Sequence, residues 1–454
     1  MSIPPTIRPK EKAAILQSLR AGVVPRSGLQ HIQVGRAREV QALLDDVERI
    51  QNGASSVRFI IGVYGAGKTF FMHLVRAIAH EKGLLTVHAD LTPDRRLHAT
   101  GGQARSLYME LMRNLASRTK PEGGALPSVV ERFVTSAMTE AKESGKKVDD
   151  VILQKLQRLS EMVGGYDFAE VIASYWKGHD TGNEQLKLDA IRWLRGEFST
   201  KTDARSALGI RTIIDDSNVY DHLKILSLFS TLSGYSGILV GLDELVNLYK
   251  LANAQARNAN YEQILMILND CLQGVSTNLG FVMCGTPDFL MDTRRGLYSY
   301  PALQSRLAEN TFAKAAGVAD FSGPVVRLSS LSPEDLFVLL GKIRHVYASG
   351  DPAKYLVPDD ALRAFMNHCS QRIGDSYFRT PRTTIKSFAD LLSLLEQNPG
   401  LEWTALLGDI KVEADISPDA SSQLLEENQA TSVEGQPSIT SKPQKEDDLT
   451  SFKL

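Results

Sequence analysis

Unbroken runs of apolar residues occur at four places in the chain, each bounded by turn-forming residues. They are VRFIIGVYG at 57–65, GLLTVHADL at 83–91, GILVGLDEL at 237–245 and GFVMCGTPD at 280–288. Runs of this length without alternation of apolar and polar positions are typical of strands that are buried on both faces of a parallel sheet. The pattern therefore predicts four parallel strands in the centre of the fold.

Helical periodicity of the apolar positions fills most of the remaining chain. It follows the first run at Phe70–His80 and the third run at Ala256–Gly274, which indicates an α/β fold with helices on both faces of the sheet. Three more helices follow residue 330, and the first of them is expected to begin with Ser332 at the N-cap and Pro333 at the first helical position.

The changes of pattern divide the chain into five parts. Residues 412–454 carry nine acidic residues against three lysines and cannot bury enough apolar surface to fold, so they are expected to be disordered. We expect an N-terminal segment with the first part of the core at 1–103, a helical insertion at 104–230, the second part of the core at 231–330, a helical lid at 331–410 and a disordered acidic tail at 411–454.

Composition and charge exclude several classes of protein. The 454 residues are 43% hydrophobic and 23% charged with a net charge of −2, as in an ordinary globular protein. The three cysteines form no CxxC pair and the nine histidines show no HxxxH spacing, so neither a disulfide framework nor a zinc site is expected. Because the sequence has no signal-type apolar region and no long apolar window, we expect a cytoplasmic protein without a membrane span.

The sequence from Gly62 to Thr69 is a G-x-x-x-x-G-K-[ST] loop that directly follows an apolar run and directly precedes an amphipathic helix. Glycines let such a loop wrap closely around phosphate oxygens, while its N–H groups and the helix N-terminus point at the anion. Lys68 would reach the β- and γ-phosphates of ATP, and the Thr69 hydroxyl would ligate Mg²⁺. The residues expected to hold the nucleotide here are Gly62, Gly65, Ala66, Gly67, Lys68, Thr69 and Phe70.

Asp243 and Glu244 end the third apolar run. In a P-loop sheet, a carboxylate at the end of the adjacent strand holds Mg²⁺ through its water shell, and a second carboxylate can deprotonate the attacking water. We assign the metal role to Asp243 and the catalytic role to Glu244. An acidic helix start after a buried strand is the alternative interpretation, but the pair downstream of a P-loop favours hydrolysis of ATP.

Three further residues resemble, by their place along the chain, functional positions of AAA+ ATPases. Thr286 ends the fourth run, where those proteins place a polar residue near the γ-phosphate; Asp288 is the second candidate, and a turn capped by both is the alternative. Arg306 stands where they supply an arginine finger to a neighbouring subunit, unless it is an ordinary surface arginine. Arg382 stands where their lids present a nucleotide-sensing arginine, with Arg379 as its substitute.

Over residues 10–400 the chain resembles the BREX-system ATP-binding protein family of the BrxC/BrxD type, an AAA+/ORC-like branch of the P-loop ATPases. The similarity includes AILQSLRAGVVPRSGLQHIQVGRAREV near the N-terminus, ILVGLDELVNLYK and TPRTTIKSF. In this family a Gly-Val-Val-Pro run, here Gly22 to Pro25, and a Gly-Arg pair, here Gly35-Arg36, precede the phosphate loop and flank the base of the nucleotide. The expected fold class is thus α/β, with an AAA+-like P-loop NTPase parallel sheet flanked by helices, an inserted helical subdomain and a C-terminal helical lid.

The resemblance implies ATP binding in a bacterial antiphage defence system, by a homo-oligomer or a complex with helicase-like proteins. The first functional hypothesis is an ATP-hydrolysing remodeller of DNA or of a partner, which would contact double-stranded DNA through its phosphates because no base-reading module is visible. The alternative is an ATP-dependent scaffold with little turnover that gates a partner helicase or nuclease. A small-molecule kinase is disfavoured because no substrate-binding constellation is visible.

Overall fold

The computed structural model describes residues 6–407, except for the side chains of Lys314 and Arg379. The acidic tail expected at 411–454 lies outside the described residues. Five strands form one parallel sheet in the order β2-β3-β4-β1-β5. Their bounds are β1 (Ser55–Ile61), β2 (Leu85–Asp90), β3 (Ile238–Asp243), β4 (Leu279–Gly285) and β5 (Val325–Arg327).

The four apolar runs all form strands of this sheet, which confirms the prediction of a parallel α/β core. The fifth strand was not predicted, since its three residues are too few to form a comparable apolar run. The sheet also differs from the expectation that the strands of the P-loop and of Asp243 are adjacent, because β4 lies between β1 and β3.

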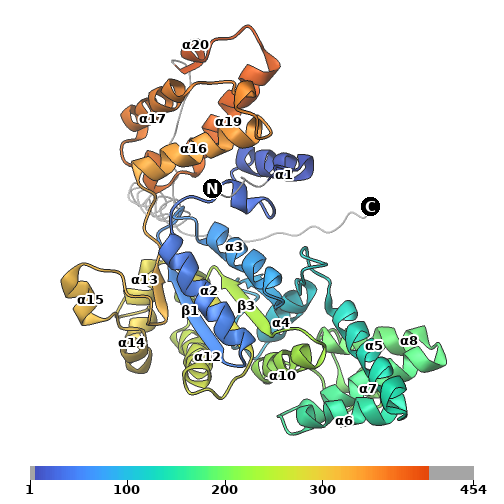
Figure 1. The fold of residues 1–454 in the computed structure, drawn as a ribbon. Coiled ribbons are helices and arrows are strands. Elements are labelled where there is room, and N and C mark those ends of the chain that lie inside the picture. Colours follow the sequence, from blue (N-terminus) through green and yellow to red (C-terminus); the bar gives the residue numbers. More distant parts are fainter. Residues whose placement is uncertain (1–5, 408–454) are drawn as a thin grey trace, which may run out of the picture.

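Helices cover both faces of the sheet (Figure 1). On one face, α2 (Ala37–Gln51) and α3 (Lys68–Glu81) share an apolar cluster with β1, β3 and β4. Gly241 lets α3 approach β3 closely, because a Cβ atom there would lie 2.8 Å from the sulfur of Met72. The other face packs against α4 (Gln103–Arg113), α10 (Val219–Leu232) and α12 (Ala254–Leu272).

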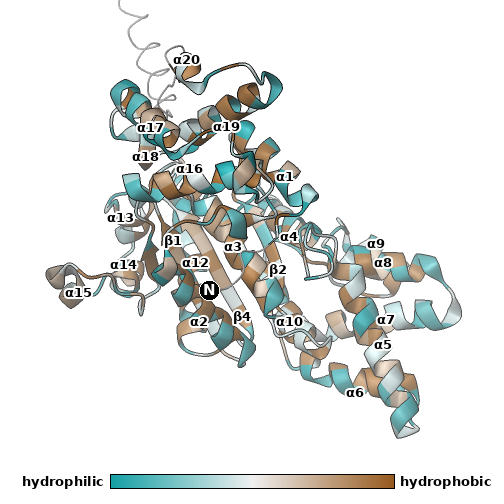
Figure 2. Cartoon of the chain, turned by 45° about the horizontal axis from the view of Figure 1, so that its top comes forward, coloured by the Kyte–Doolittle hydropathy of each residue, from teal (hydrophilic) through white to brown (hydrophobic). Residues whose placement is uncertain are grey.

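Seven helices, α4 to α10, separate β2 from β3. Figures 1 and 2 show α5 to α8 beside the sheet rather than over it, and in Figure 2 these helices carry both hydrophilic and hydrophobic stretches. Their apolar side chains belong to the same buried cluster as those of the sheet. The bounds not yet given are α5 (Leu126–Ser144), α6 (Val148–Ser160), α7 (Gly165–Thr181), α8 (Glu184–Leu194) and α9 (Lys201–Leu208).

Short helices connect the last strands, and within the described residues five helices follow β5. Ser332 caps α16 as predicted, since its hydroxyl accepts from the backbone N–H of Asp335. The connecting helices are α11 (Val246–Tyr249), α13 (Pro287–Met291), α14 (Pro301–Leu307) and α15 (Thr311–Ala316), with 3-10 turns at Leu29–His31, Leu297–Ser299 and Pro352–Lys354. The C-terminal helices are α16 (Pro333–Tyr347), α17 (Asp359–Ile373), α18 (Ser376–Arg379), α19 (Arg382–Gln397) and α20 (Trp403–Leu407).

The N-terminal helix α1 (Pro9–Arg20) packs against these C-terminal helices rather than against the sheet (Figure 1). Arg20 donates to the hydroxyl of Tyr347 over 2.9 Å, and that hydroxyl donates to Glu396 over 2.8 Å. Chain segments more than 300 residues apart therefore build one helical layer above the carboxyl edge of the sheet. Within the described residues, no helix is both long and apolar enough to cross a membrane.

Candidate nucleotide-binding site

The loop that joins β1 to α3 has the backbone needed to surround a phosphate. Gly65 and Gly67 adopt φ angles of +77° and +81°, a backbone conformation that residues other than glycine rarely adopt. Gly67 is followed directly by Lys68, the first residue of α3. The backbone N–H groups at the start of a helix have no partner within the helix, and here they lie next to the loop. The geometry that the motif predicts for anion binding is therefore present.

Lys68 is held over this loop by two backbone carbonyls. Its Nζ donates to the oxygen of Gly62 at 2.9 Å and to that of Val63 at 3.0 Å. Burial lowers the pKa of Lys68, and the negative charge of Asp243 partly opposes this change. A desolvated ammonium bonded only to neutral carbonyls is well suited to the charge of a phosphate oxygen, which forms stronger hydrogen bonds than a carbonyl does.

Thr69 and Asp243 meet although they are 174 positions apart in the sequence. The Thr69 hydroxyl donates to Oδ2 of Asp243 at 3.0 Å, while Oδ1 accepts the backbone N–H of Glu244 at 2.8 Å. The loop follows β1 and Asp243 ends β3, and β4 lies between these two strands. The two residues nevertheless meet, because α3 begins at the loop and then packs on β3. Hydroxyl and carboxylate oxygens suit Mg²⁺, which keeps several waters and takes the rest of its ligands from nucleotide phosphates.

The residues described contain no group of three or more His, Cys, Asp or Glu side chains that could enclose a metal by themselves. An Mg²⁺ ion held by Thr69 and Asp243 would therefore complete its shell with water and with the nucleotide. This fits the donor set of a P-loop site, in which the metal bridges the phosphates.

Glu244 lines the same pocket from the end of β3. It is one of the few non-glycine residues with a left-handed backbone, at a φ angle of 57°. Such conformations are costly and concentrate at functional sites, where the surrounding structure holds them. Loss of water around the side chain and, next, the negative charge of Asp243 raise the pKa of Glu244. A carboxylate with a raised pKa is a better proton acceptor.

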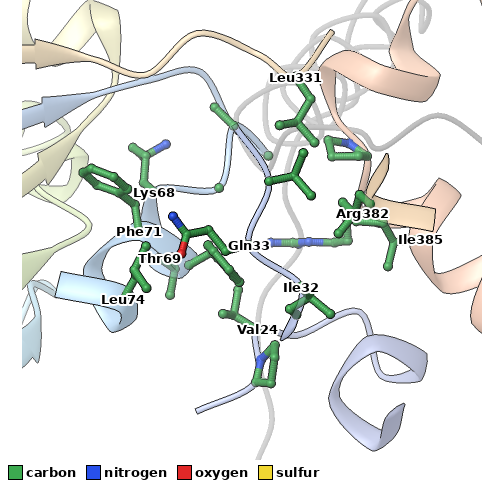
Figure 3. Close-up of a pocket in the computed structure, with 18 of the residues that line it drawn as sticks. Val24, Ile32, Gln33, Lys68, Thr69, Phe71, Leu74, Leu331, Arg382 and Ile385 are labelled. Carbon is green, nitrogen blue, oxygen red and sulfur yellow. The ribbon is translucent and has the colours of Figure 1, made fainter. Parts of the chain in front are cut away.

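The opposite wall of the pocket is apolar and comes from the N-terminal segment and the C-terminal helices. Figure 3 shows Val24 and Ile32 at the bottom of the cavity, Ile385 at its right side and Leu331 at its top. A flat apolar wall next to a phosphate loop suits a nucleobase. Val24 belongs to the Gly-Val-Val-Pro run that the family resemblance placed beside the base, whereas Ile32, Leu331 and Ile385 were not predicted.

Gly35 and Arg36 also line the pocket. Arg36, at a left-handed φ angle of 60°, donates to the backbone oxygen of Ala66 within the phosphate loop and to that of Ser329 at 3.3 Å. Loss of water lowers the pKa of Arg36. The guanidinium thus ties the N-terminal segment to the phosphate loop.

Arg382, the first residue of α19, points into the pocket (Figure 3). Its Nη1 donates to the hydroxyl of Tyr64 in the phosphate loop at 2.7 Å. Phe70, at the start of α3, lines the pocket as well. The loop, the N-terminal segment and the C-terminal helices therefore meet around one cavity.

Two of the predicted site residues lie elsewhere. Thr286 caps α13, where its hydroxyl accepts from the N–H of Phe289 at 3.3 Å, as the alternative interpretation of a capped turn has it. Arg306 donates to the side chain of Asn269 on α12 at 2.7 Å and to the oxygen of Ala302. Neither residue is part of the pocket lining, although Thr286 directly follows β4, whose last residue pairs with the end of β1 next to the phosphate loop.

Asp90 was not singled out by the sequence analysis. It ends β2 and pairs in register with Asp243, and its negative charge helps to raise the pKa of Glu244. Its position in the sequence could have indicated this role, since Asp90 lies at the end of an apolar run just as Asp243 does.

Comparison with known proteins agrees with this site. The family described as BREX system ATP-binding protein BrxC/D matches residues 7–411, which include every element of the pocket. No curated protein matches the chain. The match covers most of the sequence, and the P-loop pocket accounts for the ATP binding that the family's description states. The chain belongs to the BREX system ATP-binding protein BrxC/D family and is an ATP-binding component of a BREX system.

Proposed function

We propose that the chain is a Mg²⁺-dependent, AAA+-like ATPase that uses hydrolysis to remodel DNA or a protein partner in BREX defence. The observation that carries the proposal is the pairing of Thr69 with Asp243 at 3.0 Å, with Glu244 in the same pocket as Lys68. A site that only stores nucleotide needs the loop and the lysine. A carboxylate beside the proposed metal ligands is in addition able to activate water, and its raised pKa favours that role.

In this mechanism Lys68 binds the β- and γ-phosphates, and Thr69 and Asp243 would hold an Mg²⁺ ion, which would supply positive charge beside the phosphates. Glu244 orients the attacking water and accepts its proton. The apolar wall around Val24 and Ile32 binds the base and fixes the register of the phosphates on the loop.

Arg306 is proposed to act on the site of a neighbouring subunit as an arginine finger, and Arg382 to sense the nucleotide within its own chain. Thr286 is proposed to approach the γ-phosphate or the water when ATP is bound. The role of Arg306 requires an oligomer, since Arg306 does not line the pocket of its own chain. We further propose a cytoplasmic location, and contacts to double-stranded DNA through phosphates.

A second candidate is an ATP-dependent scaffold that gates a partner helicase or nuclease. The observation that favours it is the contact of Arg382 with Tyr64, through which the state of the phosphate loop would change the position of the C-terminal helices. In this case binding and release of nucleotide, rather than turnover, would carry the signal.

The test is phosphate release from ATP by wild type, Lys68→Ala and Glu244→Gln, with and without double-stranded DNA. DNA-stimulated release that both substitutions abolish supports the remodelling ATPase. Release that stays at background in all three proteins, while Glu244→Gln still binds ATP, would refute it in favour of the scaffold.

A further inference from the structure

A second, smaller cavity of about 70 Å³ lies beside α3, lined by other residues of that helix than the nucleotide pocket. His73, Arg76 and His80 face it from one side of α3, and His88 faces it from β2. Arg26 and Glu122 stand at its rim with side chains that are 68% and 70% exposed. The proposed ATPase mechanism uses none of these six residues.

Arg76 is the main chemical feature of this cavity. It is only 9% exposed, yet it forms no ion pair with any residue in the described part of the chain. Its Nη1 lies 3.4 Å from Nε2 of His88, and its buried Nε has no hydrogen-bond partner. A buried guanidinium without a counter-ion is strongly unfavourable unless some group from outside the chain compensates it.

The other groups add donors and positive charge. Burial and then the charge of Arg76 lower the pKa of His80 to about 4 and that of His88 to about 3, so both imidazoles are neutral near pH 7 and can donate one N–H each. Nδ1 of His88 is buried and unpaired. Two arginines beside these histidines make a cation an unsuitable ligand, so the cavity suits an anion.

Glu122 is the one carboxylate that lines the cavity. It lies 4.0 Å from Arg26, and because both side chains are exposed, their pairing is weak. Burial and then the charge of Arg26 lower the pKa of Arg76 to about 10, and the negative charge of Glu122 opposes this change only in part.

We propose that this cavity binds a phosphate group, at a site separate from the phosphate loop. Arg76 would bind the phosphate through the Nη side of its guanidinium, and Arg26 would cover the phosphate from the rim. Arginine is suited to this role because its planar fork matches phosphate oxygens in a bidentate manner. The cavity is too small for a nucleoside, so the phosphate enters alone, either as the free ion or from the backbone of a nucleic acid.

The position links this site to the nucleotide pocket. Pro25 lines the nucleotide pocket and directly precedes Arg26 in the chain. His73 and Leu74 are neighbours on α3, and they face the small cavity and the nucleotide pocket respectively. A phosphate held by Arg26 would thus contact the same segment that forms the wall for the base.

The experiment measures binding of inorganic phosphate to the full chain carrying Lys68→Ala, which weakens the phosphate loop as a competing site. Equilibrium dialysis with labelled phosphate gives the affinity and the number of sites. In this background we expect Arg76→Met to lower the affinity at least about tenfold and Arg26→Gln to lower it about threefold, as for loss of a charge-assisted hydrogen bond. Glu122→Gln should raise the affinity, since it removes the competing carboxylate.

Arg363→Gln is the matched control, because Arg363 is as exposed as Arg26 but lies on α17; it should leave the affinity unchanged. Arg26→Gln changes an exposed side chain and so keeps the test valid if Arg76→Met fails to fold. A parallel titration with a short double-stranded DNA separates the sources: DNA affinity that falls with both arginine substitutions supports a backbone phosphate, and unchanged DNA affinity supports the free ion. The proposal is overturned if phosphate binding does not respond to Arg76 or Arg26. Neither readout needs ATP hydrolysis, so the outcome is independent of the proposed function.

Discussion

Arg382 of α19 and Tyr64 of the phosphate loop are 318 positions apart in the sequence, yet Nη1 of the arginine donates to the tyrosine hydroxyl at 2.7 Å. The guanidinium carbon also lies 5.1 Å from the centre of the tyrosine ring, within the range of a cation–π interaction. The C-terminal helices therefore contact the loop that binds phosphate directly. Any movement of the loop on nucleotide binding would therefore shift the start of α19.

Arg382→Ala should weaken ATP binding about three- to tenfold, because it removes a positive charge and a loop contact that together correspond to about 1 kcal/mol. The side chain is exposed, so the melting temperature without nucleotide should change little. Binding of a fluorescent ATP analogue measures the effect. Tyr64→Phe, which keeps the ring and loses only the hydroxyl, should give a smaller loss; equal affinities for wild type and Arg382→Ala would show that Arg382 has no part in binding.

Thr69→Ala should raise the Mg²⁺ concentration that gives half-maximal ATP hydrolysis, since it removes one of the two metal ligands proposed here. Thr69→Ser keeps the hydroxyl that donates to Asp243 at 3.0 Å and is the matched control. A titration of hydrolysis against Mg²⁺ at fixed ATP distinguishes the two variants. If Thr69→Ala and Thr69→Ser give the same Mg²⁺ dependence, the threonine hydroxyl is not a ligand.

The sequence predicted the parts of this site that are local in the chain. The phosphate loop follows from the motif between Gly62 and Thr69, and the central strands follow from burial on both faces, which leaves an unbroken apolar run. The order of the strands was not predictable in this way, and β4 was not expected between β1 and β3. Nothing in a local pattern records which strand pairs with which.

The parts of the site that depend on distant contacts were not predicted either. The walls at Val24 and Ile385 come from opposite ends of the chain and meet only because α1 packs on α19. The contact of Arg382 with Tyr64 has the same origin, although the arginine itself was a candidate. Thr286 and Arg306 were proposed from their place along the chain and are not part of the pocket lining, so their roles stay predictions.

Asp46→Ala should destabilise the protein by about 3–5 kcal/mol, because it leaves the buried guanidinium of Arg58 without its partner. Both side chains are only 5% exposed, and Nη2 of Arg58 donates to Oδ1 of Asp46 at 3.1 Å. Arg113→Ala, which removes an exposed ion pair with Glu110, should change the stability by less than about 1 kcal/mol. Urea unfolding with and without each substitution gives both values; similar midpoints for the two variants would contradict this assignment.

Asp90→Asn should allow ATP hydrolysis to persist at more acidic pH than in the wild type. Glu244 can accept a proton from water only when it is ionised, so turnover falls as the pH drops through its pKa. That pKa is raised by loss of water and by the negative charges of Asp243 and Asp90. Removing the Asp90 charge stabilises ionised Glu244, lowers its pKa and shifts the acid limb of the pH–rate profile downward. Asp94→Asn, at an exposed position in the loop after β2, is the control and should leave the limb in place. A limb that stays fixed in Asp90→Asn, or that moves upward, would mean that a group other than Glu244 limits hydrolysis at low pH.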